Sequence, residues 1–438
     1  MKKLSVCLLY LLFLMSLLCL HIAEASPLRV ASASLPTDDV QSRIESEFRT
    51  RYPDVEIVWQ HGSGDIKQAM LFQDSTVDLY FVSSHFGELQ NLIEKGCYAD
   101  MSSSALITER IALLHEKLMP LVTNGAIIYA YPWSVTMGPM CSWNHDVAEA
   151  VSLPRPADKI SLADMIEWER AVTMLDDPDY AFIYDGSNNP YIGSAFDIYK
   201  YRMLATTGVL KYNTKDFREL LARLDAYTTE TDPENGPRYF VCGSSGPISG
   251  YHLQSVQSFL PMTIHREDAP VIGAFLDCIL INPYSEHTEA ALALVETLTA
   301  HQDELEFAAM STVIEPIVDT DYDENIAGYR QQIEQYQSWI AAGGDYEQYR
   351  DFFEDEIARY ERKIAAQSQY LLSQEAIDYY QQKILPYVFL LGSSIYETRD
   401  IETELFKTYS QYTYGIIDGD NFLEKMDNKL LMMAEEQQ

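Results

Sequence analysis

The chain has 438 residues, a formal net charge of −35 and 47% hydrophobic side chains. A chain of this length is too long for a single domain with one hydrophobic core, so we expect two or more domains. The acidic excess disfavours binding to nucleic acid and to anionic membranes, because both repel a negative surface. The simplest role of such a charge is to keep an exported protein soluble.

The first residues have the pattern of a secretory signal peptide. Two lysines precede an apolar stretch from Leu4 to Leu20, and Ala-Glu-Ala ends at Ala25. A charged start, an apolar core and a small-residue cleavage site are the three parts of such a peptide. We predict that residues 1–25 are removed and that the protein works in a periplasm or on the extracellular face of the membrane. An uncleaved anchor and lipid attachment at Cys19 are the alternatives.

Strand and helix patterns alternate at the start of the mature chain. Short apolar runs at Leu28–Ser34, Val55–Gln60 and Val77–Val82 predict strands, and a helical pattern follows each of them. Strands separated by helices at this spacing form parallel sheets with right-handed crossovers. A later apolar run, Val271–Asn282, predicts another buried strand. The expected fold class is therefore α/β.

Residues 325–381 have a separate pattern. Aromatic and apolar side chains recur every three or four residues on either side of Gly343–Gly344, and charges fill the other positions. This spacing predicts two helices joined by a glycine turn, a helical hairpin. Two roles stay open for the hairpin, which are an arm packed on the neighbouring domain and a surface that binds a partner.

The sequence contains no familiar catalytic or cofactor motif. It lacks the glycine-rich phosphate loops, HExxH and CxxC. The run Asp319–Glu324 resembles the start of a calcium loop, but Glu324 stands where that loop needs glycine, so we interpret it as a solvated acidic loop. We therefore predict a protein that is not an enzyme and has no metal or cofactor. A secreted carbohydrate hydrolase is the alternative, because no carboxylate pair can be singled out or excluded.

Four cysteines follow the predicted cleavage site, namely Cys97, Cys141, Cys242 and Cys278. An exported protein can form disulfides, whereas a chain of this length does not need them. Buried free thiols and one or two disulfides are therefore equally open.

Short polar loops follow the first three predicted strands. Open α/β sheets bind ligands at the carboxyl ends of their strands, where helix N-termini also offer backbone donors. These loops supply the first candidate ligand-binding residues, Ser34, His61, Ser63, Ser83 and His85.

Aromatic and amide side chains gather further along the chain. Flat rings can pack on the C–H faces of a polyhydroxyl ligand, while amides and carboxylates bind its hydroxyl groups. The candidates of this kind are Tyr131, Trp133, Tyr184, Asp185, Asn188 and Tyr251.

The stretch Ile127–Asn144 reads as strand at both ends but carries Pro132 beside Trp133. Proline is kept out of central strands, so we interpret this segment as leaving the sheet to cross a cleft between two lobes. In an extended chain Tyr131 and Trp133 face the same side. Trp133 would then lie either at the floor of the cleft or in the core beside a hinge.

The order and spacing of these segments resemble a bacterial extracellular solute-binding protein of the maltose-binding-protein type, the receptor subunit of an ABC importer. The resemblance extends from "LRVASAS" through "NGAIIYAYPWSVTMGPMCSWNHDV" and "ILINPYSEHTEAALALVETL" to "YTYGIIDGDNFLEKM". It implies two hinged α/β lobes that trap a small solute, expected to be a sugar or oligosaccharide, and deliver it to membrane permease subunits. We expect a monomer that does not bind nucleic acid.

The resemblance also implies where the lobes divide. Lobe 1 is expected to comprise 26–134 plus 277–318, and lobe 2 to comprise 135–276 plus 319–438, with the helical hairpin inserted in lobe 2. The implied crossings are Ile127–Cys141, Ala274–Ile279 and Val313–Asp319.

Overall fold

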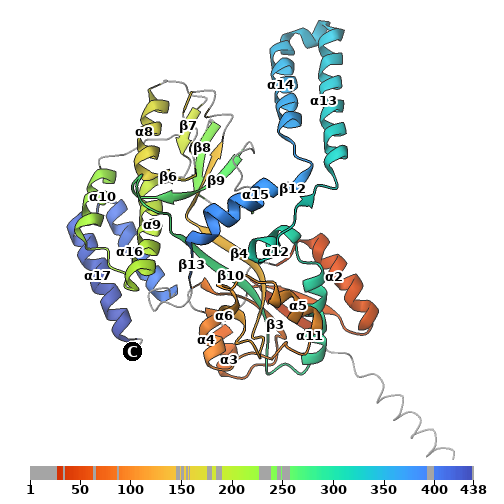
Figure 1. Cartoon of the computed structure of the whole chain (residues 1–438), viewed down its shortest axis with the longest axis vertical. Coiled ribbons are helices and arrows are strands. Elements are labelled where there is room, and N and C mark those ends of the chain that lie inside the picture. The colour runs from red at the N-terminus through yellow and green to blue at the C-terminus, as the bar shows by residue number, and fades with distance from the viewer. Residues whose placement is uncertain are drawn as a thin grey trace, which may run out of the picture.

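The computed structural model describes residues 27–436 with the exception of 33–34, 63–65, 86–87, 145–147, 149–151, 154–155, 157, 175–179, 184–189, 226–237, 244–247, 249–256 and 392–398. The predicted signal peptide therefore lies outside the described residues. The described part contains two larger sheets with helices around them, and a helical hairpin that extends away from both (Figure 1).

The first sheet begins with the parallel strands that the sequence predicts. β1 (Leu28–Ser32) pairs in parallel with β2 (Ile57–His61) and β3 (Leu79–Ser83). β10 (Ile272–Ile281) adds antiparallel to β3, and β4 (Tyr131–Gly138) adds antiparallel to β10. A short last strand, β13 (Val388–Leu390), pairs in parallel with the start of β10.

Helices cover this sheet and complete its core. Apolar side chains of the strands and helices form one buried cluster, which includes Leu28, Val30, Leu79 and Leu294, all fully buried. The helices are α2 (Asp38–Arg51), α3 (Ile66–Leu71), α4 (Glu88–Glu94), α5 (Ala105–Ala112), α6 (Met119–Val122), α11 (Thr288–Ala300) and α12 (Glu304–Met310).

The second sheet has the strand order β6-β9-β5-β8-β7. Its strands are β5 (Met140–Asn144), β6 (Ile160–Ser161), β7 (Tyr180–Ile183), β8 (Arg238–Gly243) and β9 (Gln257–Thr263). Its helices include the two C-terminal ones. Phe422 and Leu430 of the last helix are buried in this core, and Leu405 and Tyr409 of the helix before it pack against it. The helices are α8 (Leu162–Thr173), α9 (Pro190–Thr207), α10 (Lys215–Asp225), α16 (Arg399–Thr413) and α17 (Gly419–Glu436).

A third buried cluster joins the two sheets. We call it the hinge cluster, and its members include Met137 of β4, Met140 of β5, Ile272 of β10 and Leu372. The chain passes from the first sheet to the second at the cis peptide Gly138–Pro139. Helix α15 (Gln374–Tyr379), the π-helical turn Tyr380–Ile384 and the turn Leu385–Tyr387 also pack here. Two lobes that share a central packed joint are the architecture that the sequence predicts.

The predicted exit from the sheet at Pro132 is wrong. β4 stays paired with β10 from Tyr131 to Gly138, and the register places Pro132 opposite Cys278 and Ser134 opposite Asp277, so that Trp133 is one extra residue in a bulge. Proline is tolerated because β4 is an edge strand with a bulge. The predicted lobe boundaries at 134/135 and 276/277 fall inside these two paired strands.

The outer edge of β4 is covered by side chains near α12. The Gln302 amide donates hydrogen bonds to the carbonyl oxygens of Pro132, at 3.0 Å, and Trp133, at 2.6 Å. The backbone N–H of Val135 donates to the carboxylate of Glu306. Polar groups that a neighbouring strand would otherwise satisfy are thus satisfied by side chains.

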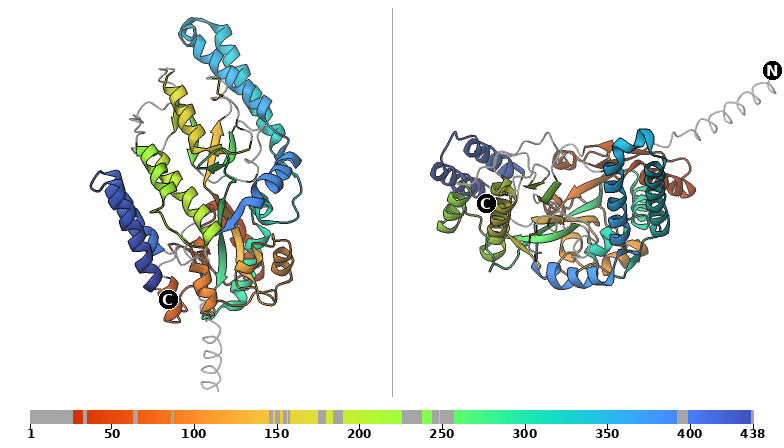
Figure 2. Two further views of the ribbon diagram at one scale, coloured as in Figure 1. Left: turned by 60° about the vertical axis from the view of Figure 1, so that its left-hand side comes forward. Right: turned by 90° about the horizontal axis from the view of Figure 1, so that it is seen from above.

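The helical hairpin is confirmed, but it ends at Ala366 and not at residue 381, because Gln374–Tyr379 packs in the hinge cluster. It consists of α13 (Tyr322–Ala342), the 3-10 turn Gly344–Tyr349 and α14 (Arg350–Ala366), with Gly343 and Gly344 at positive φ between them. The two helices pack chiefly on each other and extend away from both sheets (Figures 1 and 2), which disagrees with an arm packed on the second lobe.

The hairpin is rooted in the hinge cluster. At its base β11 (Ile317–Val318) pairs antiparallel with β12 (Tyr370–Leu372), whose Leu372 is fully buried. Asp319 is also buried, and its carboxylate accepts hydrogen bonds from the Asp321 N–H and from Gln367. The start of the acidic run is therefore a structural joint and not a solvated loop.

Among the described helices, none combines the length and apolar character that a bilayer-spanning segment needs.

Candidate functional site

The parallel strands of the first sheet end at one edge. Ser32 of β1 is in register with His61 at the end of β2, and β3 ends at Ser83 on the other side of β1. His61 is exposed, while Ser83 and His85 are half-buried. Ligands of open α/β sheets bind at such an edge. Two further predicted residues, Ser34 and Ser63, lie outside the described residues.

A row of three polar residues crosses the sheet beside this edge. Asp277 of β10 stands opposite Ser83 on β3 and opposite Ser134 on β4. The Ser134 hydroxyl donates to the Asp277 carboxylate at 3.3 Å, and Ser83 makes a second side-chain hydrogen bond to it. Burial raises the pKa of Asp277, and these two hydrogen bonds lower it in part. The carboxylate is therefore held in place by neighbours that are both hydroxyl groups.

A second carboxylate lies near the row. Burial raises the pKa of Glu306 on α12, and the charges of Asp303 and Asp277 raise it further. The Val135 N–H opposes this shift by donating to the carboxylate. Two half-buried carboxylates that repel each other are strong acceptors for uncharged donors, because a hydroxyl ligand can bind them without adding negative charge.

Half-buried rings flank the polar row. The imidazole of His85 stacks on Phe275 with ring centroids 4.5 Å apart and an interplanar angle of 10°. Trp133 packs edge-on against Phe81 at 5.9 Å. Phe275 lies two residues before Asp277 on β10, so both side chains are on one face of the sheet. The face thus combines flat rings, hydroxyl groups and carboxylates within a few residues, which suits a polyhydroxyl ligand.

One predicted ligand-binding residue is contradicted by the structure. Tyr131 is fully buried, and its hydroxyl donates to the Gln302 side chain at 2.5 Å. The bulge at Trp133 breaks the simple alternation on which the prediction rested, so the two rings differ in exposure. Trp133 is half-buried and packs on the first core. The remaining candidates, Tyr184, Asp185, Asn188 and Tyr251, lie outside the described residues.

Sequence reasoning missed four residues of this site. Asp277 had a signal, because it is the one charged residue in the apolar run Val271–Asn282. Ser134, Phe275 and Glu306 had none, since their position depends on strand register and on where α12 packs.

Cys97, Cys141 and Cys278 are buried, and Cys97 and Cys278 are free thiols. Burial raises the pKa values of Cys97 and Cys278, so both favour the unreactive thiol form. The side chain of Cys242 lies outside the described residues. Within the described part of the chain, no three His, Cys, Asp or Glu residues come together as ligands of one metal ion.

Comparison with solved structures identifies the fold. No family model and no curated protein sequence matches the chain. An ABC substrate-binding protein from Listeria monocytogenes in complex with cycloalternan shares 13% identity at a TM-score of 0.56, over 93% of this chain and 99% of its own. An ABC transporter solute-binding protein from Thermotoga lettingae with bound α-D-tagatose shares 13% at 0.55, over 93% and 98%.

Maltose-bound MalE3 from T. maritima is also similar, with 11% identity and a TM-score of 0.51, over 93% of this chain and 99% of that protein. The chain therefore has the two-lobe fold of ABC-transporter solute-binding proteins, as the sequence predicts. The match covers nearly the whole length of each neighbour.

Proposed function

We propose that this protein is the extracytoplasmic receptor of an ABC importer and captures a small polyhydroxyl solute between its two lobes. The observation that carries the proposal is the match over almost the full length of solved solute-binding proteins. The three neighbours described above hold cycloalternan, α-D-tagatose and maltose. A sugar, a polyol or an oligosaccharide is the solute class that this fold and the candidate site favour together.

The candidate site supports this chemistry from the side of the first lobe. Asp277 and Glu306 would accept hydrogen bonds from ligand hydroxyls, while Ser83 and Ser134 would hold Asp277 in register. Trp133 would offer a ring to a sugar face. Predicted residues of the second lobe, such as Tyr184 and Asp185, would complete the site when the lobes close around the solute.

The remaining parts of the proposal follow from the receptor role. The protein would be exported, act as a monomer, bind no nucleic acid and hand its solute to membrane permease subunits. It would also leave its solute chemically unchanged. The alternative of a secreted hydrolase is not supported, because the similar structures are binding proteins.

The test combines binding, closure and recovery. Maltose, D-tagatose and cycloalternan would be titrated calorimetrically into the exported chain, together with a wider panel of sugars and polyols. We expect at least one to bind, to make the protein more compact in small-angle scattering, and to be recovered intact. An unchanged scattering profile at saturation would contradict a hinged receptor, and recovery of hydrolysed sugar would support the alternative.

A further inference from the structure

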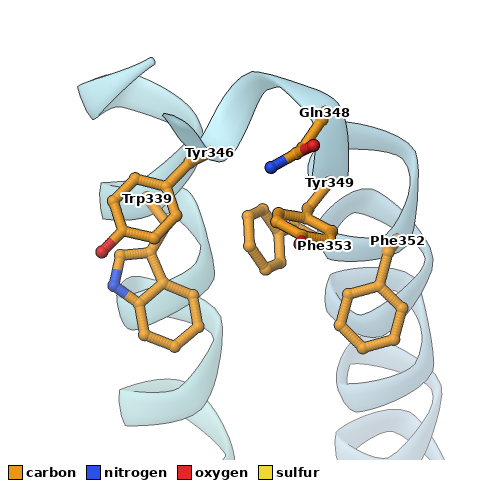
Figure 3. Close-up of a pocket in the computed structure, with 6 residues that line it drawn as sticks. All are labelled: Trp339, Tyr346, Gln348, Tyr349, Phe352 and Phe353. Atoms are coloured by element: carbon orange, nitrogen blue, oxygen red, sulfur yellow. The ribbon is translucent and has the colours of Figure 1, made fainter. Parts of the chain in front are cut away.

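The tip of the helical hairpin holds a cavity of about 500 Å³ lined by five aromatic side chains and one amide (Figure 3). We call it the tip pocket. Its lining residues are Trp339, Tyr346, Gln348, Tyr349, Phe352 and Phe353. In Figure 3 the rings of Trp339 and Tyr346 overlap on the α13 side and Phe352 stands apart on α14.

The aromatic rings at the tip are exposed, although the seam beneath them, the contact between α13 and α14, is packed. Phe353 is 6% exposed and lies within 6.3 Å, between ring centroids, of Tyr346 and Tyr349, so it fixes the pocket floor. Tyr349 and Phe352 are 52% and 56% exposed. Large apolar surface left open at the end of a projecting element is typical of a site that contacts another molecule.

Away from the tip, basic side chains of the hairpin cover its aromatic rings. Lower on the seam, Lys363 lies over the rings of Tyr329, at 5.6 Å, and Tyr360, at 5.2 Å, and Arg359 also lies over Tyr360. At the tip, no lysine or arginine of the described residues lies over Tyr346, Tyr349 or Phe352. The rings of Tyr349 and Phe352 are therefore open to a cation from outside.

The charge of the tip is strongly negative. Residues 344–356 contain six acidic side chains and one basic side chain, Arg350. That arginine is already paired, because its guanidinium donates two hydrogen bonds to Glu347, at 2.9 and 3.0 Å, and lies 3.9 Å from Glu354. An acidic rim around open rings attracts positive charge and repels anionic surfaces.

We propose that the tip pocket docks a basic segment of a partner polypeptide, with an arginine or lysine side chain against the open rings. Charge complementarity selects this occupant over the others. A second copy of this chain and an anionic membrane are both negative, and a saccharide would find one amide and few other directed partners in the lining. The site is separate from the proposed solute site, so each can fail independently.

The test uses the exported chain and an octapeptide of alternating arginine and leucine. Calorimetric titration at about 20 mM and about 300 mM salt should show binding that weakens with salt, because exposed charges are screened. The double variant Tyr349→Ala/Phe352→Ala should lose roughly tenfold in affinity, in line with loss of an aromatic anchor. Asp351→Asn/Asp355→Asn should lose affinity and most of the salt dependence.

The control is Tyr414→Ala, which removes a still more exposed ring outside the hairpin. It should leave peptide affinity unchanged, and melting curves should show that all variants fold. Equal binding of the peptide to the tip and control variants would overturn the proposal, since the acidic surface would then bind it non-specifically. Equal binding of a glutamine–leucine peptide, of anionic vesicles or of a saccharide panel at the tip would also overturn it.

Discussion

The hydroxyl of Ser134 donates a hydrogen bond of 3.3 Å to the carboxylate of Asp277 across the β4–β10 ladder. The pair lies one residue beyond the bulge at Trp133, and Ser83 binds the same carboxylate from β3. Three strands that are far apart in sequence are thus joined through one acidic side chain. The candidate site can therefore be tested separately through the protonation of Asp277, through its neighbours and through the bulge beside it.

Asp277→Asn is expected to make the protein more stable at neutral pH. Burial raises the pKa of Asp277 in the folded state, so the stability linked to this group is full below the unfolded pKa, about 3.9, and is lost as the pH rises through the folded pKa. The variant removes that loss. Melting curves should therefore separate the two proteins at pH 7 and converge near pH 3.5.

The same variant should bind solute more weakly, because it loses a charged acceptor. Asp54→Asn is the control, since Asp54 is an exposed carboxylate that lies outside the candidate site. A variant that gains nothing in stability at pH 7 would show that folding does not disfavour the charged form of Asp277.

Trp133→Ala is expected to affect both binding and stability. Loss of one aromatic anchor should weaken solute binding by about 1–3 kcal/mol. The half-buried ring also packs on Phe81, so unfolding free energy should fall, but by less than the about 3–5 kcal/mol of a fully buried tryptophan. Trp59→Ala is the control, because Trp59 is half-buried on β2 and bonded to Glu45. It should lose stability and keep affinity, whereas equal affinity loss in both variants would contradict the site.

Gly273→Ala is expected to destabilise the hinge cluster. A methyl group on Gly273 would lie 2.9 Å from the Tyr201 ring of α9 and 2.9 Å from a methyl carbon of Leu391. Such overpacking typically costs about 1–3 kcal/mol. Gly328→Ala is the control, since nothing lies within 4 Å of a methyl group there and α13 would gain a better helix former. Chemical denaturation of both variants distinguishes crowding at the joint from a general effect of losing glycine.

Deletion of residues 320–368 is expected to leave solute binding intact. The Asp319 N–H donates to the Gln369 carbonyl at 3.0 Å, so the hairpin leaves and re-enters the body at one point that a short linker can close. Solute titration and scattering should match those of the full chain, while peptide binding at the tip should vanish. A deleted protein that folds normally but loses solute affinity would place the hairpin in the solute site.

The predictable part of the fold is the part with local signals. The βαβ start and the helical hairpin follow from period and spacing, which nearby residues set. The bulge at Trp133 does not, because it depends on an edge position and on Gln302, 169 residues further along the chain. Asp277 could be noticed as a charge in an apolar run, but its serine partners are fixed only by the register of three distant strands.

The covered edge of β4 has a consequence for self-association. An unprotected edge strand offers its free backbone groups to any other chain, which is the usual start of edge-to-edge aggregation. Gln302 donates hydrogen bonds to the carbonyl oxygens of Pro132 and Trp133. The bulge also bends β4, so a strand of another chain would not align with it. Gln302→Leu would reopen that edge. Its first effect is expected to be oligomers in light scattering at high concentration, before any change in solute affinity, which would make Gln302 a determinant of solubility.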